Sequence, residues 1–219
     1  MDLQADEVRV FFAPAPRREH SAAGRALLRQ VLGEVAIGRE ANGKPVILSP
    51  GEGEGSVPSG AAQDRYGSFG VSAPQDDRLA LHFNISHSGE LVALAIAHEP
   101  VGIDIEEIRV TRDLHRIARR FFSAEEAERV DADADQFFRI WTAKEAVVKA
   151  IGSGVFDHLQ SFTVPRDAGE PSPVQGREGW VVCALEPPLV GYRAAIAMPA
   201  TRRWRISCAP CASSDSFSG

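Results

Sequence analysis

The segment 138–152, FRIWTAKEAVVKAIG, constrains the fold of this chain more than any other part of it. It holds no helix breaker before Gly152, so it predicts one helix of about three to four turns that ends at this glycine. Apolar side chains cover most of the circumference, and only Thr142, Glu145 and Lys149 form a narrow polar arc. We therefore expect a buried helix that presents a carboxylate and an ammonium group through a gap in apolar surroundings.

Lys144 lies close to the apolar sector of the same helix, where an unpaired charge is costly. One interpretation is an ordinary ion pair between Glu145 and Lys149, with the stem of Lys144 buried and its ammonium group reaching water. The other is a functional site on the polar arc. The helix alone does not decide between them.

Composition limits the classes of protein that the chain can belong to. Its 219 residues, 44% of them hydrophobic, are enough for a real core. No signal sequence starts the chain and no apolar run approaches about 18 residues, so we expect a cytoplasmic protein without membrane association. Three cysteines argue against a disulfide framework. A net charge of −6 excludes a general nucleic-acid-binding protein.

Strands and helices recur on both sides of residue 102, which predicts an α+β fold of two similar α/β-type halves. We expect an amino-terminal half at 1–102, a carboxy-terminal half at 103–211 and a disordered tail at 212–219. A mobile insertion rich in Gly, Ser and Pro is expected at 49–77. Strands are predicted at 8–12, 46–48, 81–86, 91–97, 101–106, 162–164, 179–184, 192–197 and 204–207, and further helices at 19–32, at 112–120 and after Ser123.

Acidic residues alternate with apolar ones in the predicted strand 101–106, VGIDIE. Asp104 and Glu106 therefore share one face, roughly 6 to 7 Å apart along the strand. With Glu145 they form a set of three carboxylates, the kind of oxygen donor that Mg²⁺ prefers. The simpler interpretation is a pair of solvated carboxylates at the end of a strand.

Cationic residues favour a phosphate site over that simpler interpretation. Lys44 stands between a glycine and a proline, His87 follows Ser86 at a predicted turn, and Lys144 and Lys149 flank Glu145. Mg²⁺ completes its shell with substrate phosphates, which lysines also bind. No GxxxxGK[ST], no GxGxxG after a strand and no G-x-S-x-G is present. The predicted site is therefore not a P-loop, and the pattern argues against a nucleophilic role for Ser86.

Five short motifs together resemble, in the same order, those of the Sfp-type 4′-phosphopantetheinyl transferases: GKP at 43–45, FNISHS at 83–88, VGIDIE at 101–106, FFS at 121–123 and WTAKEAVVK at 141–149. The insertion at 49–77 and the two ends of the chain depart from the family pattern. The resemblance implies two halves related by a pseudo-twofold axis, coenzyme A in the cleft between them, and Mg²⁺ on its pyrophosphate.

The resemblance also implies a reaction. The phosphopantetheine arm of coenzyme A would move to a serine of an acyl, peptidyl or aryl carrier domain, with release of adenosine 3′,5′-bisphosphate. Glu145, or Glu126 through a water molecule, would take the serine proton. By matched position the roles are metal ligands for Asp104, Glu106 and Glu145, pyrophosphate contacts for Lys144 and Lys149, and 3′-phosphate contacts for Lys44, Ser86, His87 and Arg25.

A basic helix at 112–120 is the predicted surface for the carrier domain. Its arginines lie on one face of the helix, and carrier domains of this kind are acidic around the modified serine. The simpler interpretation is a solvated face balanced by the glutamates at 125–128. Two other functions stay open, a Mg²⁺-dependent phosphohydrolase and a non-catalytic module that binds coenzyme A or a protein. We expect a monomer that docks its partner through Arg112, Arg116, Arg119 and Arg120.

Overall fold

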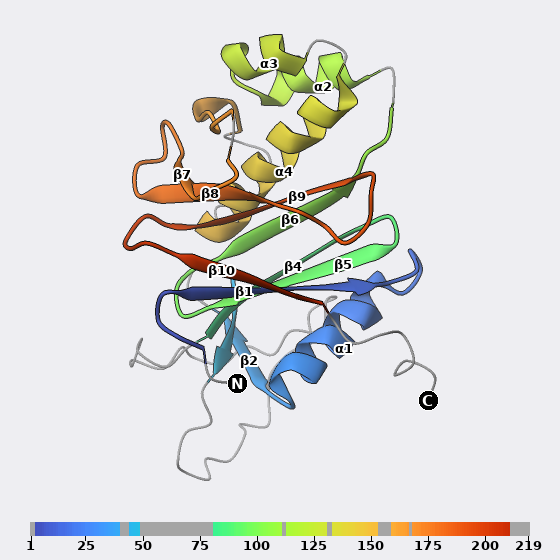
Figure 1. Cartoon of the computed structure of the whole chain (residues 1–219), viewed down its shortest axis with the longest axis vertical. Helices are drawn as coiled ribbons and strands as arrows, with labels where there is room; N and C mark the ends of the chain where they lie inside the picture. Colours follow the sequence, from blue (N-terminus) through green and yellow to red (C-terminus); the bar gives the residue numbers. More distant parts are fainter. Residues whose placement is uncertain are drawn as a thin grey trace, which may run out of the picture.

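A computed structural model describes residues 3–39, 44–48, 81–110, 113–130, 133–152, 159–166 and 168–210. The predicted insertion at 49–77 and the predicted tail at 212–219 lie outside these described residues, as do Gly43 and Arg112. Within the described part, the chain forms two β-sheets with helices packed against them (Figure 1). This arrangement confirms the predicted α+β class.

The larger sheet has six strands in the order β10-β1-β5-β4-β3-β2. Strand β1 runs parallel to β10, and the other neighbouring pairs are antiparallel. Helix α1 (His20–Leu32) packs against β5 and buries Leu27 and Leu28 in the core. The strands are β1 (Glu7–Pro14), β2 (Ala36–Arg39), β3 (Pro45–Leu48), β4 (Leu81–Ser88), β5 (Leu91–Ala97) and β10 (Arg205–Pro210).

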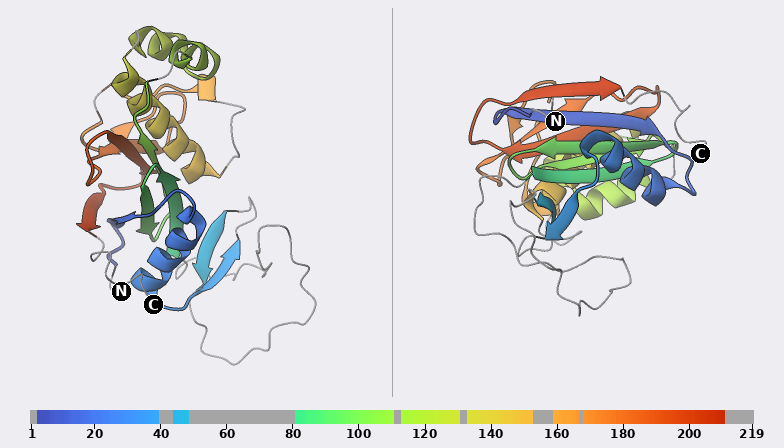
Figure 2. Two further views of the ribbon diagram at one scale, coloured as in Figure 1. Left: turned by 90° about the vertical axis from the view of Figure 1, so that its right-hand side faces the viewer. Right: turned by 90° about the horizontal axis from the view of Figure 1, so that it is seen from below.

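The smaller sheet has four antiparallel strands in the order β6-β9-β8-β7. Helix α4 (Ala134–Ile151) covers it, while α1 lies at the other end of the molecule (Figure 2). Short helices α2 and α3 lie beyond the start of α4. The elements are β6 (Gly102–Glu107), α2 (Leu114–Phe121), α3 (Ala124–Val130), the 3₁₀ turn η1 (Leu159–Ser161), β7 (Ser172–Pro173), β8 (Trp180–Leu185) and β9 (Tyr192–Pro199).

Strand β10 returns to the sheet that the first half of the chain forms. It pairs in parallel with β1, with Ile206 opposite Val8. The sequence pattern predicted a strand here but not its neighbour, because pairing over such a separation leaves no local signal. The two sheets therefore do not divide the chain cleanly at residue 102, and the proposed domain boundaries stay a prediction.

Gly102 allows α4 to lie unusually close to β6. A Cβ atom at this position would lie 2.2 Å from the carbonyl oxygen of Ala146 and 2.3 Å from the backbone nitrogen of Ala150. Both are backbone atoms, so a side chain at position 102 would require the whole helix to shift. The glycine thus brings the polar arc of α4 next to Asp104, two residues further along β6.

Strands β4 and β6 belong to different sheets but are joined by a row of side-chain hydrogen bonds, which we call the seam. Side-chain oxygens of alternate β4 residues accept N–H groups of alternate β6 residues, as backbone carbonyls do in a sheet. The donor and acceptor are always nineteen positions apart, so the two strands run in the same direction. The pairs are Ile103 N to Asn84 Oδ1 (2.9 Å), Ile105 N to Ser86 Oγ (3.3 Å) and Glu107 N to Ser88 Oγ (3.1 Å).

Candidate functional site

Asp104 lies where β4, β6 and α4 meet. The residue is only 4% exposed, and Oδ1 accepts hydrogen bonds from Ser86 Oγ at 2.8 Å and from Lys149 Nζ at 2.7 Å. Oδ2 is buried and has no hydrogen-bond partner among the described residues. Three elements thus position one carboxylate and leave one of its oxygens free to bind a further group.

Lys149 connects α4 to this carboxylate. Besides Asp104, its ammonium group donates to Ser86 Oγ at 3.0 Å and to the carbonyl oxygen of Ile103 at 3.3 Å. The Ser86 hydroxyl therefore donates once and accepts twice, which uses its full hydrogen-bonding capacity. The structure places the predicted coenzyme A contact Ser86 in the Asp104 cluster.

Glu106 and Glu145 share the site with Asp104. Burial raises the pKa of Glu106, and the charge of Asp104 raises it further, while the hydrogen bond from Ser88 opposes the shift. Burial also raises the pKa of Glu145, again with a contribution from the charge of Asp104. Burial raises the pKa of Asp104 itself, against the opposing charge of Lys149. Burial thus disfavours the ionised form of all three acids, and the positive charge of Lys149 offsets this effect only in part.

The donor chemistry of this cluster fits Mg²⁺. The candidate ligands are all carboxylate oxygens, one of which is buried without a hydrogen bond. A cation would offset the burial that raises their pKa values and, for Glu106 and Glu145, the repulsion from Asp104. Among the described residues, however, no group of three His, Cys, Asp or Glu side chains is placed closely enough to hold a metal ion. The type and charge of the donor groups therefore suit Mg²⁺, whereas their positions do not form a closed metal site.

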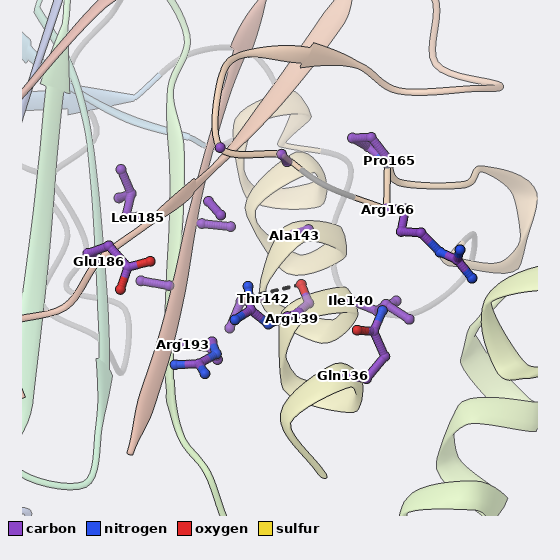
Figure 3. A pocket seen from close by; sticks show the side chains of 15 residues that line it. Gln136, Arg139, Ile140, Thr142, Ala143, Pro165, Arg166, Leu185, Glu186 and Arg193 are labelled. Carbon is purple, nitrogen blue, oxygen red and sulfur yellow. Dashed lines mark hydrogen bonds between the residues drawn. The ribbon is translucent and has the colours of Figure 1, made fainter. Parts of the chain in front are cut away.

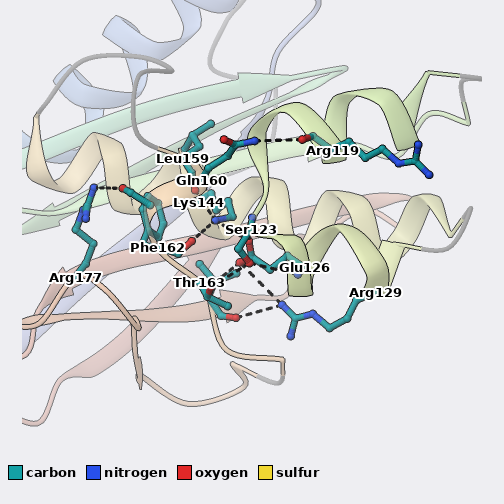
Figure 4. A network of polar contacts seen from close by, with 12 residues as sticks. Arg119, Ser123, Glu126, Arg129, Lys144, Leu159, Gln160, Phe162, Thr163 and Arg177 are labelled. Atoms are coloured by element: carbon teal, nitrogen blue, oxygen red, sulfur yellow. Dashed lines mark hydrogen bonds and ion pairs between the residues drawn. The ribbon is translucent and has the colours of Figure 1, made fainter.

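Lys144 and Glu126 form a separate, fully buried pair (Figure 4). Both side chains are 0% exposed, and Lys144 Nζ lies 2.7 Å from Glu126 Oε2. Lys144 also donates to the carbonyl oxygens of Leu159 at 2.7 Å and Phe162 at 2.5 Å. This burial argues against the expected contact of Lys144 with pyrophosphate. Its charge is neutralised inside the core instead.

Both carboxylate oxygens of Glu126 accept hydrogen bonds within the same network. Oε2 accepts the N–H of Ser123 at 2.9 Å, and Glu126 N donates to Ser123 Oγ at 3.3 Å, which makes a capping box at the start of α3. Oε1 accepts the N–H of Val164 at 2.8 Å. A carboxylate with both oxygens engaged and no access to water is poorly suited to accept a serine proton, which argues against Glu126 as the base.

The other expected phosphate contacts come from three separate segments of the chain. Lys44 is 5% exposed and donates to the carbonyl oxygen of Ala150 at 2.9 Å, near the end of α4. His87 points to the opposite face of β4 from Ser86, and its ring stacks on His20 with centroids 4.4 Å apart. Burial lowers the pKa of His87, and His20 lowers it further. Arg25 is exposed on α1.

A cavity of about 360 Å³ lies on another face of α4 (Figure 3). Ile140 and Ala143 line it from the helix, together with strands β8 and β9. Arg139 and Arg193 also line it, and both pair with Asp135, which compensates part of their charge. Glu145 and Lys149 project from a different side of the helix, so this cavity is not part of the acidic site.

Comparison with known proteins identifies the family. A family model described as the 4′-phosphopantetheinyl transferase superfamily matches residues 100–197. The chain is 32% identical over 191 residues to the 4′-phosphopantetheinyl transferase HetI of Nostoc sp. (strain PCC 7120), which covers 81% of this chain and 69% of HetI. The chain belongs to this superfamily. The family predicted from the motifs is thus confirmed.

Other members of the transferase superfamily match over shorter regions. The chain is 36% identical over 156 residues to psf-1 of Bacillus pumilus. The matched region covers 64% of this chain and 53% of psf-1. It is 43% identical over 89 residues to Sfp of Bacillus subtilis (strain 168), which is 38% of each chain. Both relatives carry the name 4′-phosphopantetheinyl transferase. In the described part of the chain, no helix is both long and apolar enough to cross a membrane.

Ser88 is a site residue that the sequence reasoning missed. Its hydroxyl lies 2.7 Å from Glu106 Oε2. The available signal was the alternation of polar residues at Asn84, Ser86 and Ser88, which places three side-chain oxygens on one face of a strand. The sequence predicts a strand that ends at Ser86 and a turn at His87, whereas β4 continues through both His87 and Ser88.

Proposed function

We propose that this chain transfers the 4′-phosphopantetheine arm of coenzyme A to a serine of an apo carrier domain. Membership of the transferase superfamily supports this function. The observation that carries it furthest in the structure is the junction of β6 and α4, where Asp104, Glu106 and Glu145 lie with Lys149. Such a combination of acids and an ammonium group suits a pyrophosphate substrate.

The reaction forms one bond and breaks another. The serine oxygen bonds to the phosphorus that carries the pantetheine arm, the bond from this phosphorus to the bridging oxygen breaks, and adenosine 3′,5′-bisphosphate leaves. Asp104, Glu106 and Glu145 would hold Mg²⁺, which supplies positive charge to the pyrophosphate. Lys149 contributes a second positive charge beside Asp104. Glu145 is the better candidate for the base, because Glu126 is fully buried with both carboxylate oxygens engaged.

The same proposal assigns the binding residues for both substrates. Lys44, His87 and Arg25 contact the 3′-phosphate of coenzyme A. The carrier domain docks on the exposed face of α2 formed by Arg116, Arg119 and Arg120, with Arg112 outside the described residues. We further propose that the protein acts in the cytoplasm as a monomer.

The intact mass of an apo carrier domain tests this function directly. After incubation with coenzyme A and Mg²⁺, the carrier should gain the mass of one phosphopantetheine arm, and chelation of the metal should prevent the gain. Release of inorganic phosphate from coenzyme A without any change in the carrier would point to a phosphohydrolase. An unchanged carrier across acyl, peptidyl and aryl carrier types would refute the proposal.

A further inference from the structure

The hydroxyl of Ser88 binds to two parts of β6 at the same time. It donates to Glu106 Oε2 at 2.7 Å and accepts the backbone N–H of Glu107 at 3.1 Å. Among the described residues, Ser88 is the only side chain that donates a hydrogen bond to the Glu106 carboxylate. The N–H of Glu107 occupies a lone pair of the Ser88 oxygen, which leaves the O–H to donate to the Glu106 carboxylate.

Ser86 repeats this geometry one step earlier along both strands. It donates to Asp104 Oδ1 at 2.8 Å and accepts the N–H of Ile105 at 3.3 Å. Each serine therefore holds one acid and takes the N–H of the residue that follows that acid. Because the spacing on β4 and β6 is equal, the two acids of β6 are held by two hydroxyls in the same way.

The two acids differ in their remaining support. Lys149 binds Asp104 at 2.7 Å, so Asp104 keeps a fixed partner without Ser86. Glu106 is longer by one methylene group, is partly exposed, and has Ser88 as its hydrogen-bond partner. A glutamate with free rotamers loses conformational entropy when it must adopt one position to bind a ligand. Loss of Ser88 should therefore affect Glu106 more than any other group in the cluster.

We propose that Ser88 is a positioning residue that holds the Glu106 carboxylate beside Asp104 and thereby sets the affinity of this acidic pair for a divalent cation. The inference rests on the proposed function, because it takes Asp104 and Glu106 as cation ligands. Groups that orient a metal ligand through one hydrogen bond typically contribute about 10-fold to 100-fold to metal affinity. Ser88 touches neither the cation nor the substrates in this role.

Direct titration of Mn²⁺ into the full chain, without coenzyme A or a carrier, tests the role of Ser88. We expect Ser88→Ala to raise the Kd for Mn²⁺ by about 10-fold, measured by calorimetry and by the electron paramagnetic resonance signal of free Mn²⁺. Ser88→Cys keeps the size of the side chain with a weaker donor, so it should give an intermediate Kd. In turnover, Ser88→Ala should raise the KM for Mg²⁺ and leave kcat at saturating Mg²⁺ almost unchanged.

Asn84→Ala is the matched control within the seam. Asn84→Ala removes the hydrogen-bond acceptor of the Ile103 N–H, just as Ser88→Ala removes the acceptor of the Glu107 N–H. Asn84, however, makes no hydrogen bond to the carboxylate of Asp104 or Glu106. We expect both variants to lower the unfolding temperature and only Ser88→Ala to weaken Mn²⁺ binding. Equal loss of Mn²⁺ affinity in both variants would overturn the inference, because the seam as a whole would then be responsible.

The outcomes also separate this inference from the proposed function. If the carrier gains the phosphopantetheine mass but Ser88→Ala and Ser88→Cys bind Mn²⁺ as tightly as the natural chain, the function stands and the inference is wrong. If Ser88→Ala weakens Mn²⁺ binding but no carrier gains mass, the inference stands and the function fails. Absence of Mn²⁺ binding to the natural chain would overturn the inference, since there would be no affinity to set.

Discussion

Asp104 combines near-complete burial with a fixed ion pair. Burial raises its pKa, whereas Lys149 and the Ser86 hydroxyl favour the ionised form. Its second oxygen, Oδ2, remains buried without a hydrogen bond among the described residues. Buried polar atoms are nearly always paired, so such an atom is expected at a binding site rather than in a purely structural cluster.

Asp104→Asn should abolish transfer and leave the fold intact. Asparagine keeps the size of the side chain but removes the charge that a cation would need, so we expect kcat/KM to fall by roughly 10³-fold. Activity is measured by intact mass of the carrier, and folding by circular dichroism and thermal unfolding. Asp6→Asn, at an exposed carboxylate that pairs with Arg205, is the control and should keep full activity. Near-normal activity of Asp104→Asn at limiting Mg²⁺ would remove Asp104 from the metal site.

The Lys144–Glu126 pair gives a second prediction at the scale of residues. Lys144→Met leaves the Glu126 carboxylate buried without its counter-ion, which typically costs about 3 to 5 kcal/mol of the free energy of unfolding. The double variant Lys144→Met with Glu126→Leu should recover a large part of this loss, because neither charge remains. Urea unfolding of the two single variants and the double variant measures both effects.

Activity of the same double variant decides between a structural and a direct role for the pair. Since both side chains are fully buried, we expect the folded double variant to keep its activity within several-fold of the natural chain. If it folds normally and loses as much activity as Asp104→Asn, one member of the pair acts directly on the substrates.

The alternation of apolar and acidic residues was enough to predict the Asp104 and Glu106 pair, because period-two patterns on a strand are local. The partner of Lys144 was not predictable in this way. Its place in the apolar sector showed that it needed a counter-ion, and the capping box located Glu126 at the start of a helix. That the two meet depends on how α3 packs on α4, which no local pattern contains.

Among the secondary-structure elements, α4 and β6 position the site through their close approach at Gly102. Gly102→Ala places a Cβ atom 2.2 Å from a backbone oxygen of α4, so the helix must move away from β6. We expect a loss of about 1 to 3 kcal/mol in the free energy of unfolding. Activity should fall as well, because Lys149 and Glu145 move with the helix.

Gly169→Ala is the control for this substitution. A Cβ atom at Gly169 has no heavy atom within 4 Å, so this variant should unfold at nearly the same urea concentration as the natural chain. Gly102→Ala with unchanged stability and activity would show that α4 need not lie so close to β6.

The predicted elements agree with the structure to different degrees. The strand predicted at 91–97 is β5 (Leu91–Ala97), a run of seven buried residues. Helix α4 begins at Ala134, before the predicted start at 138, because Asp133 caps it by accepting the N–H of Asp135 at 2.9 Å. Strands β2 and β7 were missed, and the strand predicted at 162–164 forms only a single bridge between Thr163 and Gln175. The missed strands, of four and two residues, carry little periodicity, although the four-residue strand β3 (Pro45–Leu48) was predicted at 46–48.

At the scale of the whole molecule, contacts from late in the chain hold its early part in place. The Tyr192 hydroxyl on β9 accepts the N–H of Glu90 at 2.9 Å, in the turn between β4 and β5. Arg205 on β10 pairs with Asp6 at 2.8 Å, next to the start of β1. The Arg205–Asp6 pair holds β10 to β1 within the larger sheet, whereas the Tyr192 contact and the seam join the two sheets. The acidic site lies where the two sheets meet.

The distribution of charge over the molecule bears on the choice of protein partner. The net charge is −6, yet Arg116, Arg119 and Arg120 are exposed together on α2. Arg116 pairs with Asp113 at 3.3 Å, but both side chains are largely exposed, so the pair contributes little to stability. A local basic face on an acidic protein favours an acidic partner and disfavours basic ones.

Charge reversal on this face gives the last prediction. Arg116→Glu with Arg119→Glu should raise the KM for an acidic carrier domain severalfold and leave the affinity for coenzyme A unchanged. Attraction between exposed charges acts on association and is screened over about 8 Å at physiological ionic strength. The double variant should therefore also lose most of the salt dependence of kcat/KM.

Arg29→Glu with Arg203→Glu is the control, because it changes the net charge equally at exposed positions outside α2. It should leave the KM for the carrier and the salt dependence of kcat/KM as they are. If carrier kinetics and their salt dependence survive the reversal on α2, or if the control variant changes them equally, the carrier does not dock on this helix.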